Sequence, residues 1–381
     1  MYSLGKSTKS LLAEFGGDMA SNERIYNIFF KLVTRLRPQQ FSDKRDTIYG
    51  FAGLLQAVLT PGTSSPIHAD YSLSSVDVHT NQVWDMVSNM SYLDVLSRTQ
   101  FVVLAADYPS WVPRWWIPFV GTNIQTVQAG VVDREQFDAS KSKSPSWSFR
   151  LTEGRGLTLV GARLAAITLS DTELFPEKIG ATLLKMLLKM LLGQELTYLS
   201  TAEPKDGALC RTLLGDTFSN RRIMPKDRAV FQEWWMNALG RSIALLRSEG
   251  RSGEGDIINL LGKLGSDWEW LPSLEDVLNA ADSFVVGEEL PSSSVQVAIH
   301  RFWIRRTFFL TEAGHFGLGP RSLDVMDEVW LLKGGRTPFA LRKRANGNGY
   351  HLIGEVYVHG VMYGEAATPA FNEQMCPVTI F

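Results

Sequence analysis

Hydrophobic residues recur at helical spacing through the first hundred residues of the chain. In residues 22–36 the apolar positions fall on one helical face, and residues 46–59 repeat this pattern. A loop rich in proline, glycine and serine at residues 60–66 ends the section, and residues 75–96 return to helical spacing. These patterns predict a helical unit over residues 1–108.

The middle of the chain combines helical patterns with a segment that cannot be a regular helix. This Trp/Pro-rich segment, residues 110–119 (SWVPRWWIPF), is interrupted by prolines. Residues 149–161 alternate like a strand pair around a glycine-rich turn, whereas residues 176–199 and 229–246 again have helical spacing. We therefore expect residues 109–295 to form a mixed, mainly helical body that includes the Trp/Pro-rich segment.

The last part of the chain changes to short strands separated by turns. Residues 305–320 are predicted to form a hairpin, and residues 337–359 to form a strand, an Asn-Gly turn and a second strand. Residues 327–335 add a further strand and turn. We expect residues 296–381 to form a small β-rich subdomain packed on the body. The predicted fold class is α+β, a mainly helical body with a small C-terminal antiparallel β-barrel or sheet.

Composition and charge exclude several classes of protein. With 381 residues the chain is long enough for about two or three domains and a large core. Lysine plus arginine number 38 and aspartate plus glutamate 40, so the overall charge does not favour nucleic acid or an anionic membrane as partner. Cys210 and Cys376 fit neither a disulfide framework nor a paired metal site, which indicates a reducing compartment.

Targeting and membrane signals are not found in the sequence. The N-terminus lacks the apolar run of a signal peptide and the arginine-rich, acid-poor character of a transit peptide. The most apolar window, residues 181–192, is interrupted by Lys185 and Lys189 and is shorter than the about 20 residues that a membrane span needs. We expect this window to be a buried helix with a narrow polar stripe, and the protein to be cytoplasmic.

Short motifs follow one another in a characteristic order along the chain. They are DKRDTIYG at 43–50, ADYS at 69–72, LDVL at 93–96, PSWVP at 109–113, RTL at 211–213 with GD at 215–216, RTFFLTEAG at 306–314, GLGP at 317–320, DEVW at 327–330 and GEVYVHGVMYGE at 354–365. None of these motifs is specific by itself. Their order resembles that of the C-terminal region of fungal heterokaryon-incompatibility (HET) proteins.

The resemblance also indicates what the chain lacks. HET proteins carry an N-terminal core with a TIR-like fold and segments of the Y-x-W-G and I-D-A-I-C-I-N-Q type, and these segments have no counterpart in this sequence. The activity of that core is therefore not transferred to this chain. Among the shared residues, Asp46 and Tyr49 flank a helix start, and we expect them to have a structural role.

Familiar catalytic and metal-binding motifs are absent from the sequence. It contains no G-x-S-x-G, H-E-x-x-H, C-x-x-C, Walker or G-x-G-x-x-G motif. The acidic residues 324–328 superficially resemble a metal motif of terpene synthases, but they precede a predicted strand, which favours a solvated turn. His351 and His359 would lie about 27 Å apart on one presumed strand, too far to bind one metal ion. We expect neither a metal nor a cofactor.

The aromatic content favours a pocket. The chain has 11 tryptophans, and a large core accounts for most of them. In the Trp/Pro-rich segment, however, adjacent rings cannot both face the same way, so one of them is expected to line a cavity for an apolar molecule. The predicted substrate-binding wall is Trp111, Trp115 and Trp116, and the candidate catalytic residues are Tyr108, His315 and Arg305.

Two functions from different classes fit these observations. The first is a cofactor-independent cyclase of fungal secondary metabolism, a pericyclase of the Diels–Alder [4+2] type, which would shape an apolar terpenoid or polyketide substrate by positioning and electrostatic polarisation. The alternative is a non-catalytic interaction protein of heterokaryon incompatibility or innate immunity. The partners expected are an apolar small molecule for the first and a second protein for the alternative. A homo-oligomer is compatible with both.

Overall fold

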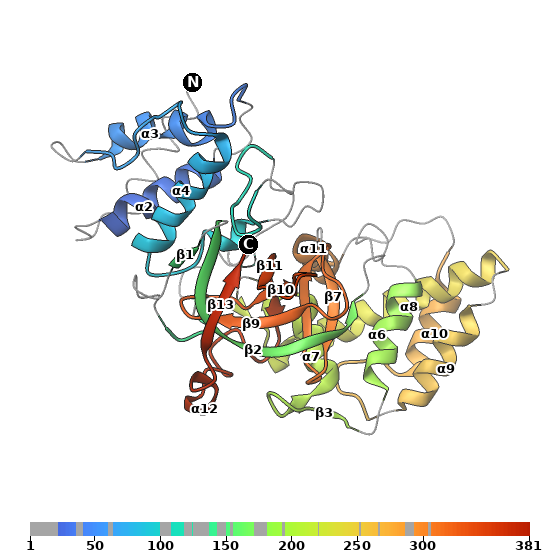
Figure 1. Cartoon of the computed structure of the whole chain (residues 1–381). Coiled ribbons are helices and arrows are strands. Elements are labelled where there is room, and N and C mark those ends of the chain that lie inside the picture. Colours follow the sequence, from blue (N-terminus) through green and yellow to red (C-terminus); the bar gives the residue numbers. More distant parts are fainter. Residues whose placement is uncertain are drawn as a thin grey trace.

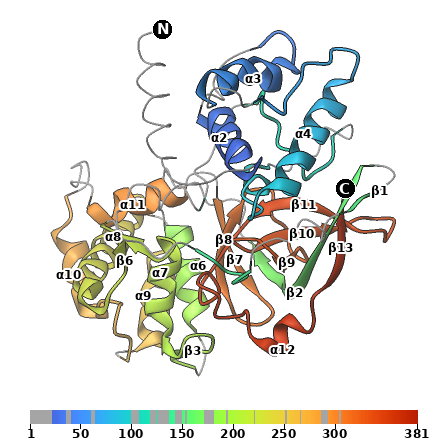
Figure 2. The same ribbon diagram turned by 90° about the vertical axis from the view of Figure 1, so that its left-hand side faces the viewer.

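The computed structural model shows helices at the N-terminal end, a curled sheet and a group of helices to one side of that sheet (Figure 1, Figure 2). It describes residues 22–35, 41–59, 64–99, 108–117, 124, 137–142, 150–152, 155–170, 181–192, 195–219, 221–250, 253–265, 267–285, 293–303 and 306–381. The chain belongs to the α+β class, as the sequence predicts.

In the described residues up to 99, which we call the N-terminal unit, three helices and a short 3-10 helix are present: α2 (Asn22–Arg35), α3 (Asp46–Val58), α4 (Ser75–Asn89) and η1 (Leu96–Arg98). Ser74 caps α4, because its hydroxyl accepts a hydrogen bond from the backbone N–H of Asp77. Phe29 of α2, Ile48 of α3 and Val83 of α4 are fully buried. The apolar faces that predict these helices are therefore the faces on which they pack.

The first two HET-like motifs hold the N-terminal unit together. The Tyr49 hydroxyl donates to the backbone oxygen of Asp70 at 3.0 Å, and the Tyr71 hydroxyl donates to the Asp46 carboxylate at 2.6 Å. The Arg45 guanidinium donates to the backbone oxygen of Tyr71 at 2.6 Å. These bonds attach the loop before α4 to the start of α3, so Asp46 and Tyr49 have the structural role expected of them.

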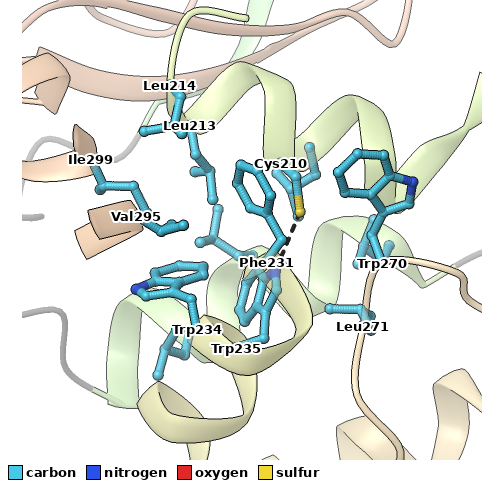
Figure 3. Close-up of a cluster of buried hydrophobic side chains, with 14 of the residues drawn as sticks. Cys210, Leu213, Leu214, Phe231, Trp234, Trp235, Trp270, Leu271, Val295 and Ile299 are labelled. Carbon is cyan, nitrogen blue, oxygen red and sulfur yellow. Dashed lines mark hydrogen bonds between the residues drawn. The ribbon is translucent and has the colours of Figure 1, made fainter. Parts of the chain in front are cut away.

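The helical body contains α6 (Ala181–Leu191), α7 (Lys205–Leu213), η3 (Pro225–Asp227), α8 (Arg228–Ser248), α9 (Glu254–Leu264), α10 (Leu274–Ser283) and α11 (Ser294–Trp303), with the hairpins β3 (Thr197–Tyr198) with β4 (Glu203–Pro204) and β5 (Thr217–Phe218) with β6 (Arg221–Arg222). Its centre is aromatic, as Figure 3 shows. Phe231 and Trp235 of α8 are fully buried there, and the Trp235 indole N–H donates to the Cys210 sulfur at 3.4 Å.

Helix α6 is the apolar window of the sequence, and it is buried as expected. Leu184, Leu187 and Leu188 are fully buried, while Lys185 reaches out to an ion pair with Asp256 at 3.1 Å. Within the described part of the chain, the helices are all too short or too polar to cross a membrane.

The main sheet draws its strands from two parts of the sequence. These strands are β1 (Arg150–Thr152), β2 (Gly156–Ser170), β7 (Arg306–Thr311), β8 (Phe316–Pro320), β9 (Glu328–Leu332), β10 (Phe339–Lys343), β11 (Tyr350–Glu355), β12 (Tyr357–Val358) and β13 (Cys376–Ile380), with the short helix α12 (Pro369–Asn372) before β13. The predicted hairpins are present as β7–β8 and β10–β11. The predicted strand pair of residues 149–161 is present as β1–β2, and β2 continues into the C-terminal sheet.

Besides β1, strand β2 is long enough to pair with three further strands in succession. Its first part pairs with β13, its middle with β9 and its last part with β7, all antiparallel. Gly161 has a partner on both sides, Cys376 and Leu332. A Cβ atom at Gly161 would lie only 2.7 Å from the Leu332 Cδ2 atom, so the close approach of the strands requires glycine.

The sheet is strongly curled but does not close completely. From β2 the pairing passes through β13, β11 and β10 to β9, which pairs with β2 again. The link between β11 and β13 is parallel and consists of the single pair Tyr350 and Ile380. The predicted antiparallel barrel or sheet is therefore present as an incompletely closed barrel with one parallel link.

The N-terminal helices and the curled sheet share one core. Phe29 and Ile48 belong to the same buried cluster as Trp330, Phe339 and Leu352 of the sheet. Burial of side chains from both regions against each other means that neither apolar surface faces solvent there. The division of the chain near residues 108 and 295 stays a prediction.

Candidate functional site

Two of the three predicted pocket tryptophans lie in the core shared by the helices and the sheet. Trp111 and Trp115 are at most 1 % exposed. The Trp111 indole N–H donates to the backbone oxygen of Arg155 at 2.9 Å, and the Trp115 ring packs edge-on against Phe30 with centroids 6.3 Å apart. Both are therefore core tryptophans, and the indole nitrogen of Trp111 is tied to the backbone.

The half-buried Trp116 and Tyr108 form an aromatic group with the fully buried His79. The ring centroids of Tyr108 and Trp116 are 4.8 Å apart, and that of His79 lies 4.9 Å from Trp116. The Tyr108 hydroxyl donates to the Ser75 hydroxyl at 2.8 Å, and the Lys44 ammonium lies 5.0 Å from the Trp116 ring centroid. Burial lowers the pKa of His79 to about 4, so its imidazole is neutral at physiological pH.

His315, one of the candidate catalytic residues, lies in a different part of the fold from the aromatic group. His315 lies in the turn between β7 and β8, where its backbone N–H donates to the Thr311 hydroxyl at 3.0 Å. Burial lowers the pKa of His315, and the neighbouring His359 lowers it further. Arg305 lies outside the described residues. The structure thus places His315 beside His359 and leaves its role, like that of the aromatic residues, a prediction.

A polar pocket lies beside His359, where the helical body meets the sheet. Its volume is about 230 Å³. The helix α7 and the hairpins β3–β4 and β5–β6 supply one side, and the chain from β12 onward supplies the other. The lining residues are Thr201, Glu203, Arg211, Asp216, Arg222, Tyr357, His359, Gly360, Met362, Tyr363 and Glu365.

His359 is held in the pocket wall through both of its ring nitrogens. Nε2 lies 2.6 Å from Glu203 Oε1, and Nδ1 lies 2.9 Å from the Tyr357 hydroxyl. Because an ionised carboxylate only accepts hydrogen bonds, Nε2 carries a proton. In the neutral imidazole, Nδ1 then accepts from Tyr357. The result is a fixed chain of hydrogen bonds from Tyr357 through His359 to Glu203.

Two arginines share one buried carboxylate on the opposite wall. Asp216 Oδ1 accepts from Arg211 at 2.8 Å, and Asp216 Oδ2 accepts from Arg222 at 2.8 Å. Arg211 also pairs with Glu203 at 2.8 Å, so this second group is connected to the His359 chain. The Arg222 guanidinium lies 3.9 Å from the Tyr363 ring centroid, a stacking distance.

The ionisation of the pocket groups follows from these contacts. Burial raises the pKa of Glu203, but its hydrogen bond with His359 and the charges of His359 and Arg211 outweigh burial and bring the pKa to about 2. Burial raises the pKa of Tyr357 well above its usual value, and the nearby Asp216 adds to this shift. At neutral pH the pocket therefore presents an ionised Glu203 and an un-ionised Tyr357, which suits hydrogen bonding better than nucleophilic attack.

Unusual backbone conformations cluster around the pocket. Asp216 and Ala202 have positive φ angles of 54° and 57°. Gly360 has a φ of 78°, and a Cβ atom there would lie 2.9 Å from the Thr201 Cγ2 atom. Non-glycine residues in this conformation cost free energy, and such strain tends to accumulate at functional sites.

The pocket unites two motifs that lie far apart in the sequence. Arg211 and Asp216 come from the RTL and GD motifs, and Tyr357, His359 and Glu365 come from the motif at residues 354–365. In the sequence both motifs indicate only a resemblance, and no site is predicted there. The prediction that His351 and His359 lie on one strand is wrong, because β11 ends at Glu355 and His359 follows β12.

The acidic residues 324–328 form ion pairs and hydrogen bonds within the chain. Asp327 is buried, and the Arg342 guanidinium donates to it at 2.7 Å. Asp327 also accepts from the backbone N–H of Asp324 at 2.8 Å, so it orders the turn before β9. Among the described residues, no three histidine, cysteine, aspartate or glutamate side chains are grouped so that they could hold a metal ion.

Comparison with known proteins agrees with the motif order. Residues 287–376 match the model of the Het-6 beta-barrel domain. The chain is also 39% identical over 67 residues to heterokaryon incompatibility protein 6, OR allele, of Neurospora crassa. That alignment covers 17% of this chain and 10% of the Neurospora protein. No solved structure matches the chain significantly. Residues 287–376 are therefore similar to the Het-6 β-barrel domain, and part of the chain is similar to a fungal heterokaryon-incompatibility protein of which it covers only a small share.

Proposed function

We propose that this protein is a non-catalytic interaction protein of heterokaryon incompatibility, and that the pocket beside His359 is its binding site. The observation that carries the proposal is the convergence of two HET-like motifs, at residues 211–216 and 354–365, on one polar pocket. Motifs that serve only packing have no reason to place charged side chains together around an open pocket. The similarity to a Neurospora incompatibility protein supports the same biological context. We further propose that the protein acts in the cytoplasm.

The geometry of the pocket favours binding over catalysis. Both ring nitrogens of His359 are engaged, by Glu203 and by Tyr357. A general base needs a nitrogen within reach of a substrate proton, and a nucleophile needs a lowered pKa. Tyr357 has a raised pKa instead. Fixed, mutually paired polar groups are what a recognition site requires.

An incompatibility assay tests this function. The full chain is expressed in a fungal strain that lacks the gene, and the strain is fused with tester strains of different incompatibility types. We expect a growth arrest or cell-death reaction with at least one tester, because an interaction protein of this type acts on cell fusion. Wild-type growth of every fusion, with the protein expressed and folded, would contradict the proposal.

A variant pair connects the reaction to the pocket. Thr201→Val and Glu365→Gln change exposed groups at the pocket rim, and we expect the double variant to weaken the reaction. The matched control is Thr168→Val with Glu269→Gln, which changes an exposed threonine and an exposed glutamate outside the pocket lining. An equal reaction from both double variants would separate the protein's function from the pocket.

The cyclase function keeps one observation in its favour. Tyr108 and Trp116 are half-buried and adjacent, with the Lys44 ammonium 5.0 Å from the Trp116 ring. Such a surface can contact an apolar polyene, with a cation nearby to polarise it. The test is to incubate the purified chain with linear polyene precursors and compare product diastereomer ratios with buffer. A ratio that changes with the wild-type chain and returns to the buffer value with Trp116→Ala would favour the cyclase over the interaction protein.

A further inference from the structure

We infer that the pocket beside His359 binds a small, uncharged polyhydroxyl compound of about the size of one sugar ring. The inference rests on the proposed function in one respect only, namely that this pocket is the binding site of the protein. It assigns the chemical class of the ligand from the charge, geometry and size of the pocket.

The charges of the pocket disfavour ligands of either sign. The lining contains three carboxylates, those of Glu203, Asp216 and Glu365, and two guanidiniums, those of Arg211 and Arg222. An anion that approached the guanidiniums would also face Glu203 and Glu365. A cation that approached the carboxylates would face the arginines. Because both signs are interleaved over one small surface, a net charge gains little from it.

An uncharged ligand with several hydroxyl groups can form hydrogen bonds with the carboxylates and the guanidiniums at the same time. A hydroxyl group donates one hydrogen bond and accepts others, so it can donate to Glu203 or Glu365 and accept from Arg211. Hydrogen bonds to ionised partners are shorter and stronger than those between neutral groups. The Thr201 hydroxyl, which donates to Glu203 at 2.6 Å, offers a further acceptor at the rim.

The polar groups are also held in place before a ligand arrives. Glu203 is fixed by His359 and Arg211, at 2.6 and 2.8 Å. Asp216 is fixed by Arg211 and Arg222, both at 2.8 Å. A site whose side chains are already ordered loses little conformational entropy on binding. This matters for a polyol, because each of its hydroxyl groups must give up a hydrogen bond to water.

The volume of the pocket limits the size of the ligand. About 230 Å³ is smaller than the roughly 300–1,000 Å³ of sites for drug-sized ligands. The lining has few apolar groups, with Met362 buried and Tyr363 stacked under Arg222. A long apolar chain would therefore displace water from charged groups without forming hydrogen bonds to them. A single ring that carries hydroxyl groups meets both limits.

Saturation-transfer difference NMR on the full chain tests the assignment. The uncharged probes are glucose, mannose, galactose, N-acetylglucosamine and myo-inositol, and the charged probes are inorganic phosphate, citrate and spermidine. We expect transfer to at least one uncharged probe and an increase in the thermal unfolding temperature with the same probe. Binding of charged probes alone, or of none of the probes, would overturn the ligand class.

Rim variants show whether the bound probe occupies this pocket. We expect Thr201→Val with Glu365→Gln to reduce the affinity at least tenfold, whereas Thr168→Val with Glu269→Gln leaves it unchanged. Equal affinity of both double variants would place the probe elsewhere and overturn the site. If no uncharged probe binds, but the rim variant still abolishes the incompatibility reaction, the ligand class fails while the proposed function stands.

Discussion

The Trp/Pro-rich segment and the pocket beside His359 both concentrate unusual residues, but they use them in opposite ways. Trp111 and Trp115 are fully buried and pack into the core that joins the N-terminal helices to the sheet. The groups around His359 are charged, paired with one another and open to solvent on one side. Large rings at a junction stabilise the fold, whereas ordered charges around an opening provide a surface for recognition.

The largest expected effect on stability comes from the buried tryptophans of the Trp/Pro-rich segment. Trp111→Ala removes a fully buried ring and the hydrogen bond from its indole to Arg155. We expect the free energy of unfolding to fall by about 3–5 kcal/mol, measured by urea denaturation. A loss below about 1 kcal/mol would mean that the ring borders an open cavity, as the cyclase hypothesis requires.

A somewhat smaller loss is expected in the pocket wall. Asp216→Asn leaves two arginines without their shared carboxylate, and Arg211 is only 15% exposed. Asparagine tolerates the positive φ of this position, so the change tests the charge and not the backbone. We expect a loss of roughly 3 kcal/mol. Asp256→Asn, which breaks the exposed pair with Lys185, is the control and should cost less than about 1 kcal/mol.

The pH dependence of stability should report the Glu203 contacts. The folded pKa of Glu203, about 2, lies below its ordinary value of 4.5, so the unfolded chain binds this proton more readily. The stabilisation is therefore complete above about pH 5 and is lost as the pH falls toward 2. We expect about 2–3 kcal/mol over this window, measured by denaturation at a series of pH values.

Glu203→Gln provides the matched comparison for that profile. Glutamine cannot ionise, so the variant should be less stable at pH 7 and lose less stability on acidification. A profile identical to that of the wild type would show that Glu203 and His359 are not paired in solution.

The smallest expected effect lies at the exposed side of the aromatic group. Lys44→Ala removes the ammonium 5.0 Å from the Trp116 ring. We expect a change below about 1 kcal/mol in the free energy of unfolding, because an exposed cation–π contact contributes roughly 0.5–1 kcal/mol. A loss comparable to that of Trp111→Ala would show that this surface is part of the core.

The sequence predicts the helices and hairpins more fully than it predicts which distant strands pair with each other. The spacing of apolar residues indicates α8 and α6, and the Asn-Gly turn indicates the β10–β11 hairpin. The length of β2, which continues to Ser170, is not evident from its pattern. Its pairing with β9 and β13 depends on strands more than 150 residues further along the chain. Periodicity reports local structure, so it cannot identify such partners.

The pocket beside His359 is likewise not predictable from local sequence patterns. Arg211 and His359 each lie within a motif of the sequence, but no local pattern connects the two residues. Glu203 and Arg222, which complete the two groups of paired charges, lie outside the motifs and have no distinguishing neighbours in the sequence. The aromatic residues drew attention because tryptophan is rare and large. In the fold, Trp111 and Trp115 became core residues, because burial is the strongest driving force for such side chains.

The most direct test of the account compares the two regions in one incompatibility assay. Strains carrying Trp116→Ala or Thr201→Val with Glu365→Gln are fused with the tester that reacts with the wild-type protein, at matched levels of folded protein. We predict that the rim variant weakens or abolishes the reaction while Trp116→Ala retains it. A full reaction from the rim variant together with a lost reaction from Trp116→Ala would contradict it and move the functional site to the aromatic group.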